Sequence, residues 1–282
     1  MDKVLIIGEN RIQYDMAKTL AERDFAIFYY GVMSYEKPKG VKLVKDVDLL
    51  RNLLADPTCL TVLPIELHIG EKENVEAGQP ALLILENNNL IDRAGHGLTQ
   101  KCKFWSPDAD AKAKPKLAQL LSEAAIVEGK LLLGKAISQT RALVIGFDVY
   151  AEQIARRLQD WECDVIVMPD DEMEYQLAAY RKYTVCEKNR LETVQGETGK
   201  RLELVYQCSG YQILTGKEMG FLSDNAVILN LTDKSQAVDM KYAARNHICV
   251  KHANHLLLEY ASVETGRILA EAAAELVEKE KR

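Results

Sequence analysis

The chain has 282 residues, of which 48% are hydrophobic and 28% charged, and its formal net charge is −6 at pH 7. This length exceeds what one hydrophobic core comfortably holds and predicts two domains. The composition is that of an ordinary globular protein, which excludes the disordered and fibrous classes. The negative charge argues against a nucleic-acid or anionic-membrane partner, because both require a basic surface. We therefore expect a small molecule or another protein as the partner.

Cysteine spacing and hydropathy predict a cellular compartment. The cysteines show no CxxC pair and no zinc or disulfide spacing; they stand at positions 59, 102, 163, 186, 208 and 249. This pattern predicts buried thiols in a reducing compartment and no metal site. No stretch approaches the roughly 18 apolar residues of a membrane span, and the apolar run Val4–Ile7 is too short for a signal sequence. We expect a cytoplasmic protein without membrane contact.

Two segments that start 138 residues apart share one pattern, because residues 4–29 align with residues 142–167 without a gap. Each begins with an aliphatic run that ends in a glycine, continues as an amphipathic helix and closes with a second aliphatic run. Such runs are typical of strands buried on both faces of a parallel sheet. We predict an α/β protein with two doubly wound, Rossmann-like or flavodoxin-like domains, parallel sheets and a cleft between the domains.

Further aliphatic runs predict more strands, at 60–63, 81–85 and 101–105 in the first half and at 183–186, 202–207, 226–229 and 247–250 in the second. Short helices are expected near 46–54 and 239–245. Residues 109–137 predict a helix that bridges the domains, although Pro115 and Gly129 interrupt it. We place an N-terminal domain at 1–118, completed by a C-terminal helix at 258–282, and an NAD(P)-binding-type domain at 119–257.

The loop after Gly146 bears on dinucleotide binding. The fingerprint G-x-G-x-x-G/A requires small residues at three positions, and this loop reads Gly146-Phe147-Asp148-Val149-Tyr150-Ala151. The first and third positions conform, but the middle glycine is Asp148. An aspartate there can cap the following helix by itself and occupy the amides that a phosphate would use. NAD and NADP are the candidate cofactors, and Asp148 is the observation against both.

Asp170 ends the next predicted strand, 24 residues beyond Gly146, where an acidic residue can accept hydrogen bonds from ribose hydroxyls. The alternative interpretation is a turn residue after Pro169 or a cap of the next helix. Loops beyond the carboxyl ends of parallel strands bind ligands in open α/β sheets. The candidate cofactor-binding residues are Gly146, Phe147, Asp148, Val149, Ala151, Asp170, Ser209 and Gly210.

The same rule predicts substrate-binding residues, namely Arg11, Glu66, His68 and Thr232. Arg11 would serve as a carboxylate clamp, and the alternative for each is a solvated loop residue. His252 and His255 follow the last predicted strand and are candidates for a general acid or base. Their spacing also suits a metal pair but matches no recognised metal motif, and a helix cap or surface pair is the alternative.

Several segments, taken in order, resemble the family of dipicolinate synthase A subunits over nearly the whole chain. They are Val4–Gly8 followed by Arg11 and Gln13, Val62–Ile65, Ala125–Gly129, Ser138–Gly146, Val227–Leu231 followed by Asp239–Ala243, and Val263–Ala270. The resemblance implies an N-terminal substrate-side domain and a Rossmann domain for NAD(P). It also implies an oxidoreductase that acts on a dihydrodipicolinate-type dicarboxylate intermediate and whose partner is a flavoprotein-like B subunit. We further expect a homo-oligomer.

Three loops depart from this family's glycine-rich pattern. Asp148 replaces a glycine, and the loops Thr232–Ser235 and Asn254–Leu257 replace two glycine-containing loops. Three hypotheses remain open. The chain is a divergent NAD(P)-dependent oxidoreductase, a binding or partner protein that has lost the cofactor, or an enzyme that uses His252 and His255 without a dinucleotide.

Overall fold

The computed structural model describes residues 3–279 except 24, 34, 63–102, 106–109, 189, 195–200, 212–213 and 233–236. The described chain forms two compact units: residues 3–62, 103–117 and 257–279 make the first, and residues 118–256 make the second. The boundary between Leu117 and Ala118 lies inside helix α4 (Ala113–Leu133). Pro115 does not interrupt α4, because it occupies the first turn, where its missing N–H has no intrahelical partner to lose.

The first unit contains a five-stranded parallel sheet in the order β3-β2-β1-β4-β5. Its strands are β1 (Lys3–Ile7), β2 (Ala26–Tyr30), β3 (Val41–Leu43), β4 (Cys59–Val62) and β5 (Lys103–Trp105). Helix α2 (Val47–Ala55) contributes Leu50, Leu53 and Leu54 to a core with Leu5 and Ile7. The predicted strand at 81–85 lies outside the described residues. The sequence did not predict β3, because three residues are too few to show a strand pattern.

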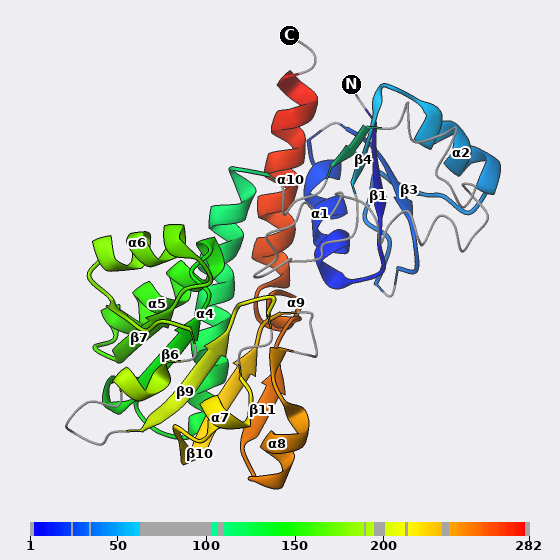
Figure 1. Ribbon diagram of the computed structural model, residues 1–282. Helices are drawn as coiled ribbons and strands as arrows, with labels where there is room; N and C mark the ends of the chain where they lie inside the picture. Colours follow the sequence, from blue (N-terminus) through cyan, green and yellow to red (C-terminus); the bar gives the residue numbers. More distant parts are fainter. Residues whose placement is uncertain are drawn as a thin grey trace. The chain divides into compact units, whose positions relative to one another are not determined.

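Helix α10 (Ser262–Lys279) packs on α1 (Arg11–Ala21) within the first unit, although the two are far apart in sequence (Figure 1). Gly266 allows this approach, because a Cβ there would lie 2.8 Å from both the Ile12 carbonyl oxygen and the Asp15 Cβ. Lys116 pairs with Glu271 at 3.6 Å, and Lys112 pairs with Glu275. The C-terminal helix is therefore part of the first unit's core.

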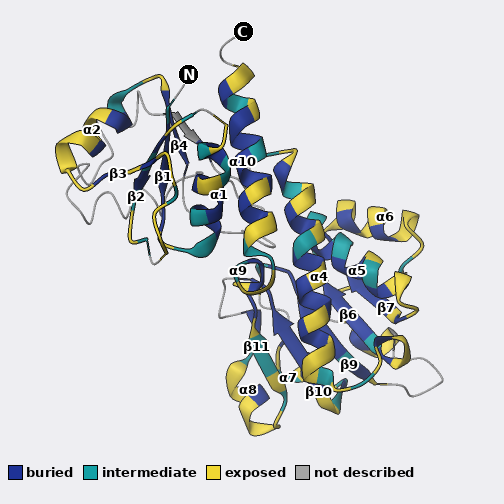
Figure 2. Cartoon of the chain, turned by 180° about the vertical axis from the view of Figure 1, so that it is seen from behind, coloured by how far each residue is buried: buried dark blue, intermediate teal, exposed yellow. Residues whose placement is uncertain are grey.

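The second unit contains a six-stranded parallel sheet in the order β11-β10-β9-β6-β7-β8. The strands are β6 (Arg141–Ile145), β7 (Asp164–Met168), β8 (Thr184–Val185), β9 (Leu202–Gln207), β10 (Leu222–Asn230) and β11 (Cys249–His252). Counted within the unit this is 3-2-1-4-5-6, the doubly wound Rossmann order, which reverses between β6 and β9. Its inner strands are buried (Figure 2). The prediction of two α/β units with parallel sheets is confirmed.

Helices and short 3-10 turns connect or flank these strands. The helices are α5 (Val149–Asp160), α6 (Glu172–Tyr180), α7 (Gly216–Met219), α8 (Met240–Arg245) and α9 (Leu256–Tyr260). The 3-10 turns are Ile137–Gln139 and Leu191–Val194. In the described part of the chain, no helix combines the length and apolar character that a membrane span requires.

Two sequence predictions need correction. The last strand runs Cys249–His252 and not 247–250, because His247 adopts a φ of 56° and ends the turn after α8. His252 therefore ends the strand and does not follow it. Cys249 is exposed on this edge strand, whereas Cys59, Cys163, Cys186 and Cys208 are buried as predicted. Cys102 lies outside the described residues.

Candidate functional site

The loops after β6 and β9 meet at the switch point of the second sheet. Gly146 has a φ of +84°, and a Cβ there would lie 3.3 Å from the carbonyl group of Cys208 and 3.4 Å from the Ser209 nitrogen. Glycine is therefore required both by its backbone conformation and by the neighbouring loop. The structure brings Gly146 and Ser209 together at the edge where open α/β sheets bind ligands.

Asp148 caps helix α5. Its Oδ1 accepts hydrogen bonds from the backbone amides of Tyr150, at 3.0 Å, and Ala151, at 2.9 Å. The predicted capping role of Asp148 is confirmed. These amides belong to the helix terminus that binds the pyrophosphate in a dinucleotide fold, so a protein carboxylate already occupies the donors that a phosphate would need.

Glu174, on α6, joins the loops after β6 and β7. Its Oε2 accepts from the amide of Phe147 at 2.9 Å and from the amide of Asp170 at 2.8 Å, and only 7% of the residue is exposed. In the sequence Glu174 belongs to an acidic run, Asp170–Glu174, that is typical of a solvated face, so its burial was not predicted. The signal that could have found it was Asp171, which stands three residues earlier, caps α6 and accepts from the Glu174 amide at 2.9 Å; an Asp followed by Glu at that interval indicates a helix start.

Asp170 lies beside Ser209, whose hydroxyl donates to the Asp170 Oδ1 at 2.7 Å. The helix cap that the sequence left open for Asp170 is made by Asp171 instead. Burial raises the pKa of the neighbouring Cys208 thiol well above its usual value, and the charges of Asp148 and Asp170 raise it further. Acidic side chains thus surround the α5 terminus.

The residues present at this edge do not fit a pyrophosphate. Asp148 holds two of the α5 amides and Glu174 holds the Phe147 amide. The dipole of a helix N-terminus favours one anion, and Asp148 already supplies it. A phosphate would have to displace this carboxylate while remaining near Asp170.

The carboxyl ends of β9, β10 and β11 carry a row of polar side chains. Gln207, Asn230 and His252 are register neighbours across these strands. Asn230 Nδ2 lies 3.2 Å from His252 Nδ1, and Asn230 Oδ1 accepts from the amide and hydroxyl of Thr232 at 3.3 and 3.0 Å. The structure therefore brings the candidates Thr232 and His252 together through a residue, Asn230, that the sequence did not single out.

His255 is exposed in the turn before α9. Among the described residues, no three His, Cys, Asp or Glu side chains gather in a way that could hold a metal ion. Gly210 follows Ser209 in the loop after β9, and Val149 begins α5. Glu66 and His68 lie outside the described residues.

In the first unit, the loop after β1 also provides a side chain that caps the following helix. Asn10 caps α1 by accepting from the amides of Ile12 at 3.0 Å and Gln13 at 3.3 Å. Gln13 stands at the third fingerprint position, and its side chain lies so close to Gly8 that a Cβ on Gly8 would be 2.7 Å from the Gln13 Cδ. A buried carboxamide thus fills the space above the first glycine.

Arg11, the candidate carboxylate clamp, already has partners within the first unit. Its Nε donates to Asp15 Oδ2 at 2.7 Å, and its guanidinium carbon lies 4.5 Å from the Tyr35 ring centroid and 5.2 Å from that of Tyr14. Hydrogen bonding to Asp15 and then to Tyr35 raises the Arg11 pKa. The guanidinium is oriented by these groups, and substrate binding by Arg11 stays a prediction.

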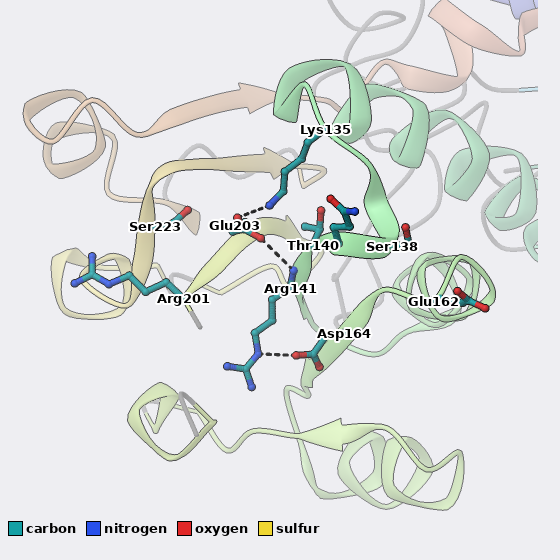
Figure 3. Close-up of a pocket in the computed structure, with 10 residues that line it drawn as sticks. Lys135, Ser138, Thr140, Arg141, Glu162, Asp164, Arg201, Glu203 and Ser223 are labelled. Atoms are coloured by element: carbon teal, nitrogen blue, oxygen red, sulfur yellow. Dashed lines mark hydrogen bonds and ion pairs between the residues drawn. The ribbon is translucent and has the colours of Figure 1, made fainter. Parts of the chain in front are cut away.

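A cavity of about 330 Å³ lies at the opposite, amino-terminal edge of the second sheet (Figure 3). Four of its charged side chains form two pairs: Lys135 with Glu203 at 2.5 Å and Arg141 with Asp164 at 2.9 Å. Glu203 also accepts from the Arg141 amide at 3.4 Å. These four side chains are therefore held by contacts within the protein, and Glu162 and Arg201 also line the cavity.

The sequence matches no protein-family model and no curated protein. Among solved structures, the dipicolinate synthase A subunit from Bacillus halodurans matches with a TM-score of 0.70, 12% identity and 98% coverage of both chains. The A subunit from Bacillus subtilis matches with a TM-score of 0.69 and 15% identity, covering 98% of this chain and 96% of that one. The chain has the fold of the dipicolinate synthase A subunits.

The D-isomer specific 2-hydroxyacid dehydrogenase from Lactobacillus delbrueckii ssp. bulgaricus, solved in an NAD-complexed form, has the same arrangement. It matches with a TM-score of 0.56 and 11% identity, and the match covers 99% of this chain and 97% of that one. The chain therefore shares its fold with a dehydrogenase that was solved with NAD bound. At these identities the likeness establishes the fold alone.

Proposed function

We propose that this chain is a non-catalytic binding or partner protein that keeps the two-domain dehydrogenase scaffold and has lost dinucleotide binding. The observation that carries the proposal is the double hydrogen bond from the Tyr150 and Ala151 amides to Asp148. In this interpretation the carboxylate takes the place of the pyrophosphate and keeps the loop after β6 closed.

Two free-energy terms oppose the binding of a phosphate at the loop after β6. Releasing the cap costs about 1 kcal/mol of helix stability. A phosphate placed about 4 Å from the Asp148 carboxylate would also be repelled by it. The electrostatic repulsion is roughly 4 kcal/mol at the effective dielectric constant of a protein surface. Removal of Asp148 would relieve both terms, which makes this residue the point at which the proposal can be tested.

The experiment is a calorimetric titration of the protein with NADH and NADPH, in the wild type and in Asp148→Gly. Asn10→Gly is the matched control, because it removes the equivalent cap from the first unit. The proposal expects no binding by the wild type or the control. Tight binding of either dinucleotide by the wild type would refute it, whereas binding by Asp148→Gly alone would show that the carboxylate closes the site.

A second candidate is an NAD(P)-dependent oxidoreductase of the dipicolinate synthase A type, acting on a dihydrodipicolinate-type dicarboxylate with a flavoprotein-like B subunit. It is favoured by the match over 98% of the chain to two such proteins and by Asp170 just beyond the end of β7, where a ribose would lie. Dinucleotide binding by the wild type would support this candidate. A failure of even Asp148→Gly to bind would exclude it.

A further inference from the structure

His252 is an exposed histidine whose ring is held by buried side chains. It ends the edge strand β11, and its Nδ1 lies 3.2 Å from Asn230 Nδ2. Asn230 is 0% exposed and Thr232 is 2% exposed. Two polar side chains that burial would otherwise penalise are thus arranged behind one solvent-facing imidazole.

The hydrogen-bond network fixes the tautomer of this imidazole. The Thr232 backbone N–H can only donate, so the Asn230 atom that it contacts at 3.3 Å is the carbonyl oxygen. The Thr232 hydroxyl contacts the same oxygen at 3.0 Å. The atom that faces His252 is therefore the amide nitrogen, which donates. Nδ1 of His252 must accept, and the proton of the neutral ring resides on Nε2.

We propose that His252 is a fixed hydrogen-bond donor, through Nε2–H, for a carboxylate or carbonyl oxygen of a small-molecule ligand at the carboxyl ends of β10 and β11. An Nε2 that carries a proton has no lone pair to offer, so it serves neither as a metal ligand nor as a base. An oxygen acceptor is its complement. Asn230 and Thr232 are positioning residues that keep the proton on Nε2.

The location favours a ligand over a purely structural role. The carboxyl edge of a doubly wound sheet is where ligands bind, and an imidazole on the surface gains little stability from a fixed orientation. A donor that is already oriented loses less conformational entropy when a ligand arrives. This inference goes beyond the proposed function, since it holds whether or not the loop at Asp148 admits a dinucleotide.

The first test reads the tautomer by nitrogen NMR of the histidine rings. His252 should show a protonated Nε2 and an unprotonated Nδ1. His247 is the internal control, because it is exposed and its ring has no hydrogen-bond partner within the described part of the chain, so both tautomers should average. Asn230→Asp should move the His252 proton to Nδ1, because a carboxylate only accepts. A wild-type His252 protonated on Nδ1, or averaged like His247, would overturn the proposal.

The second test asks which oxygen binds. Pyridine-2,6-dicarboxylate and its neutral diamide are titrated separately while the His252 Nε2 signal is followed. A shift with the first alone identifies a carboxylate, and a shift with both identifies a carbonyl-type acceptor. His252→Ala should weaken binding about tenfold, the factor for about 1.4 kcal/mol, and His252→Gln should restore part of it, because its amide nitrogen also donates. If neither compound moves the Nε2 signal, the ligand role is refuted.

Discussion

Asn10 and Asp148, which are 138 positions apart, cap equivalent helices in the two units, each through the equivalent pair of backbone amides. Each accepts from the backbone nitrogens two and three residues ahead, at distances between 2.9 and 3.3 Å. The second unit, which has the better dinucleotide fingerprint, therefore begins its helix in the same way as the first. The two caps differ in charge and not in hydrogen-bond geometry.

We predict that Asp148→Ala lowers the free energy of unfolding by about 1 kcal/mol, since two helix amides lose their acceptor. Asp148→Asn should retain the wild-type value within a few tenths of a kcal/mol, because asparagine caps equally well. Asn10→Ala in the first unit should behave like Asp148→Ala. Urea unfolding measures all three, and a stabilised Asp148→Ala would mean that repulsion from nearby carboxylates outweighs the cap.

Glu174 should be the more sensitive residue at this edge. Glu174→Ala removes the oxygen that accepts from the Phe147 and Asp170 amides, and we expect a loss of about 2 to 6 kcal/mol, since each lost acceptor costs about 1 to 3 kcal/mol. Glu174→Gln keeps an acceptor oxygen and should lose less. Amide hydrogen exchange provides the direct check: Phe147 and Asp170 should exchange faster in Glu174→Ala, and unchanged exchange would contradict the proposed bridge.

The fold could be predicted from the sequence, because strands buried on both faces of a sheet appear there as continuous aliphatic runs. The runs that end at Gly8 and Gly146 predicted both βαβ units, and strand β9 was predicted with its observed ends. Short or half-exposed elements were missed. β3 and α7 are too short for periodicity to register, and β11 has no fully buried residue to mark its ends.

The candidate site could be predicted from the sequence only in part. The cap by Asp148 could be predicted, because it is a contact between near neighbours in the chain. The contacts that Glu174 and Asn230 make with other strands and loops could not be predicted, because these partners are distant in sequence. Asp170 lies two residues beyond the end of β7 and does not end the strand as predicted. Its bond with Ser209 depends on the strand order, in which β6 separates β7 from β9.

The close approach of α1 and α10 predicts a strong effect of Gly266→Ala. The added methyl would lie within 2.9 Å of the Ile12 carbonyl, the Asp15 Cβ and the Met16 nitrogen, so the helices must separate. We expect a loss of about 1 to 3 kcal/mol, measured by thermal or urea unfolding. Glu264→Ala, on an exposed position of the same helix, should stay within about 0.5 kcal/mol of wild type. Equal effects of the two would argue against this packing.

Alkaline pH should destabilise the second unit through Cys163. Burial, followed by the charge of Asp164, raises the pKa of this thiol from 9.0 to about 12. Between these values the unfolded chain releases the proton and the folded chain retains it, so stability falls as pH rises from about 9, by at most about 1.4 kcal/mol per pH unit. Below that range both states hold the proton and no effect is expected.

The measurement compares unfolding free energies at about pH 8 and about pH 10. Cys163→Ser should lose less stability over this interval than the wild type, because serine does not titrate there. Cys249→Ser is the control, since it removes a thiol that is exposed in the folded protein. Parallel curves for Cys163→Ser and wild type would show that this thiol is not responsible.

The packing of α10 on α1 sets the order in which the units can be completed during synthesis. A ribosome that has released residues 118–256 has released all the described strands of the second unit, whereas the first unit still lacks the helix that covers Ile12 and Met16. The apolar face of α1 therefore stays uncovered until the last part of the chain has been synthesised. A nascent chain halted before Ser262 would contain one complete unit and one unit whose core is exposed to solvent.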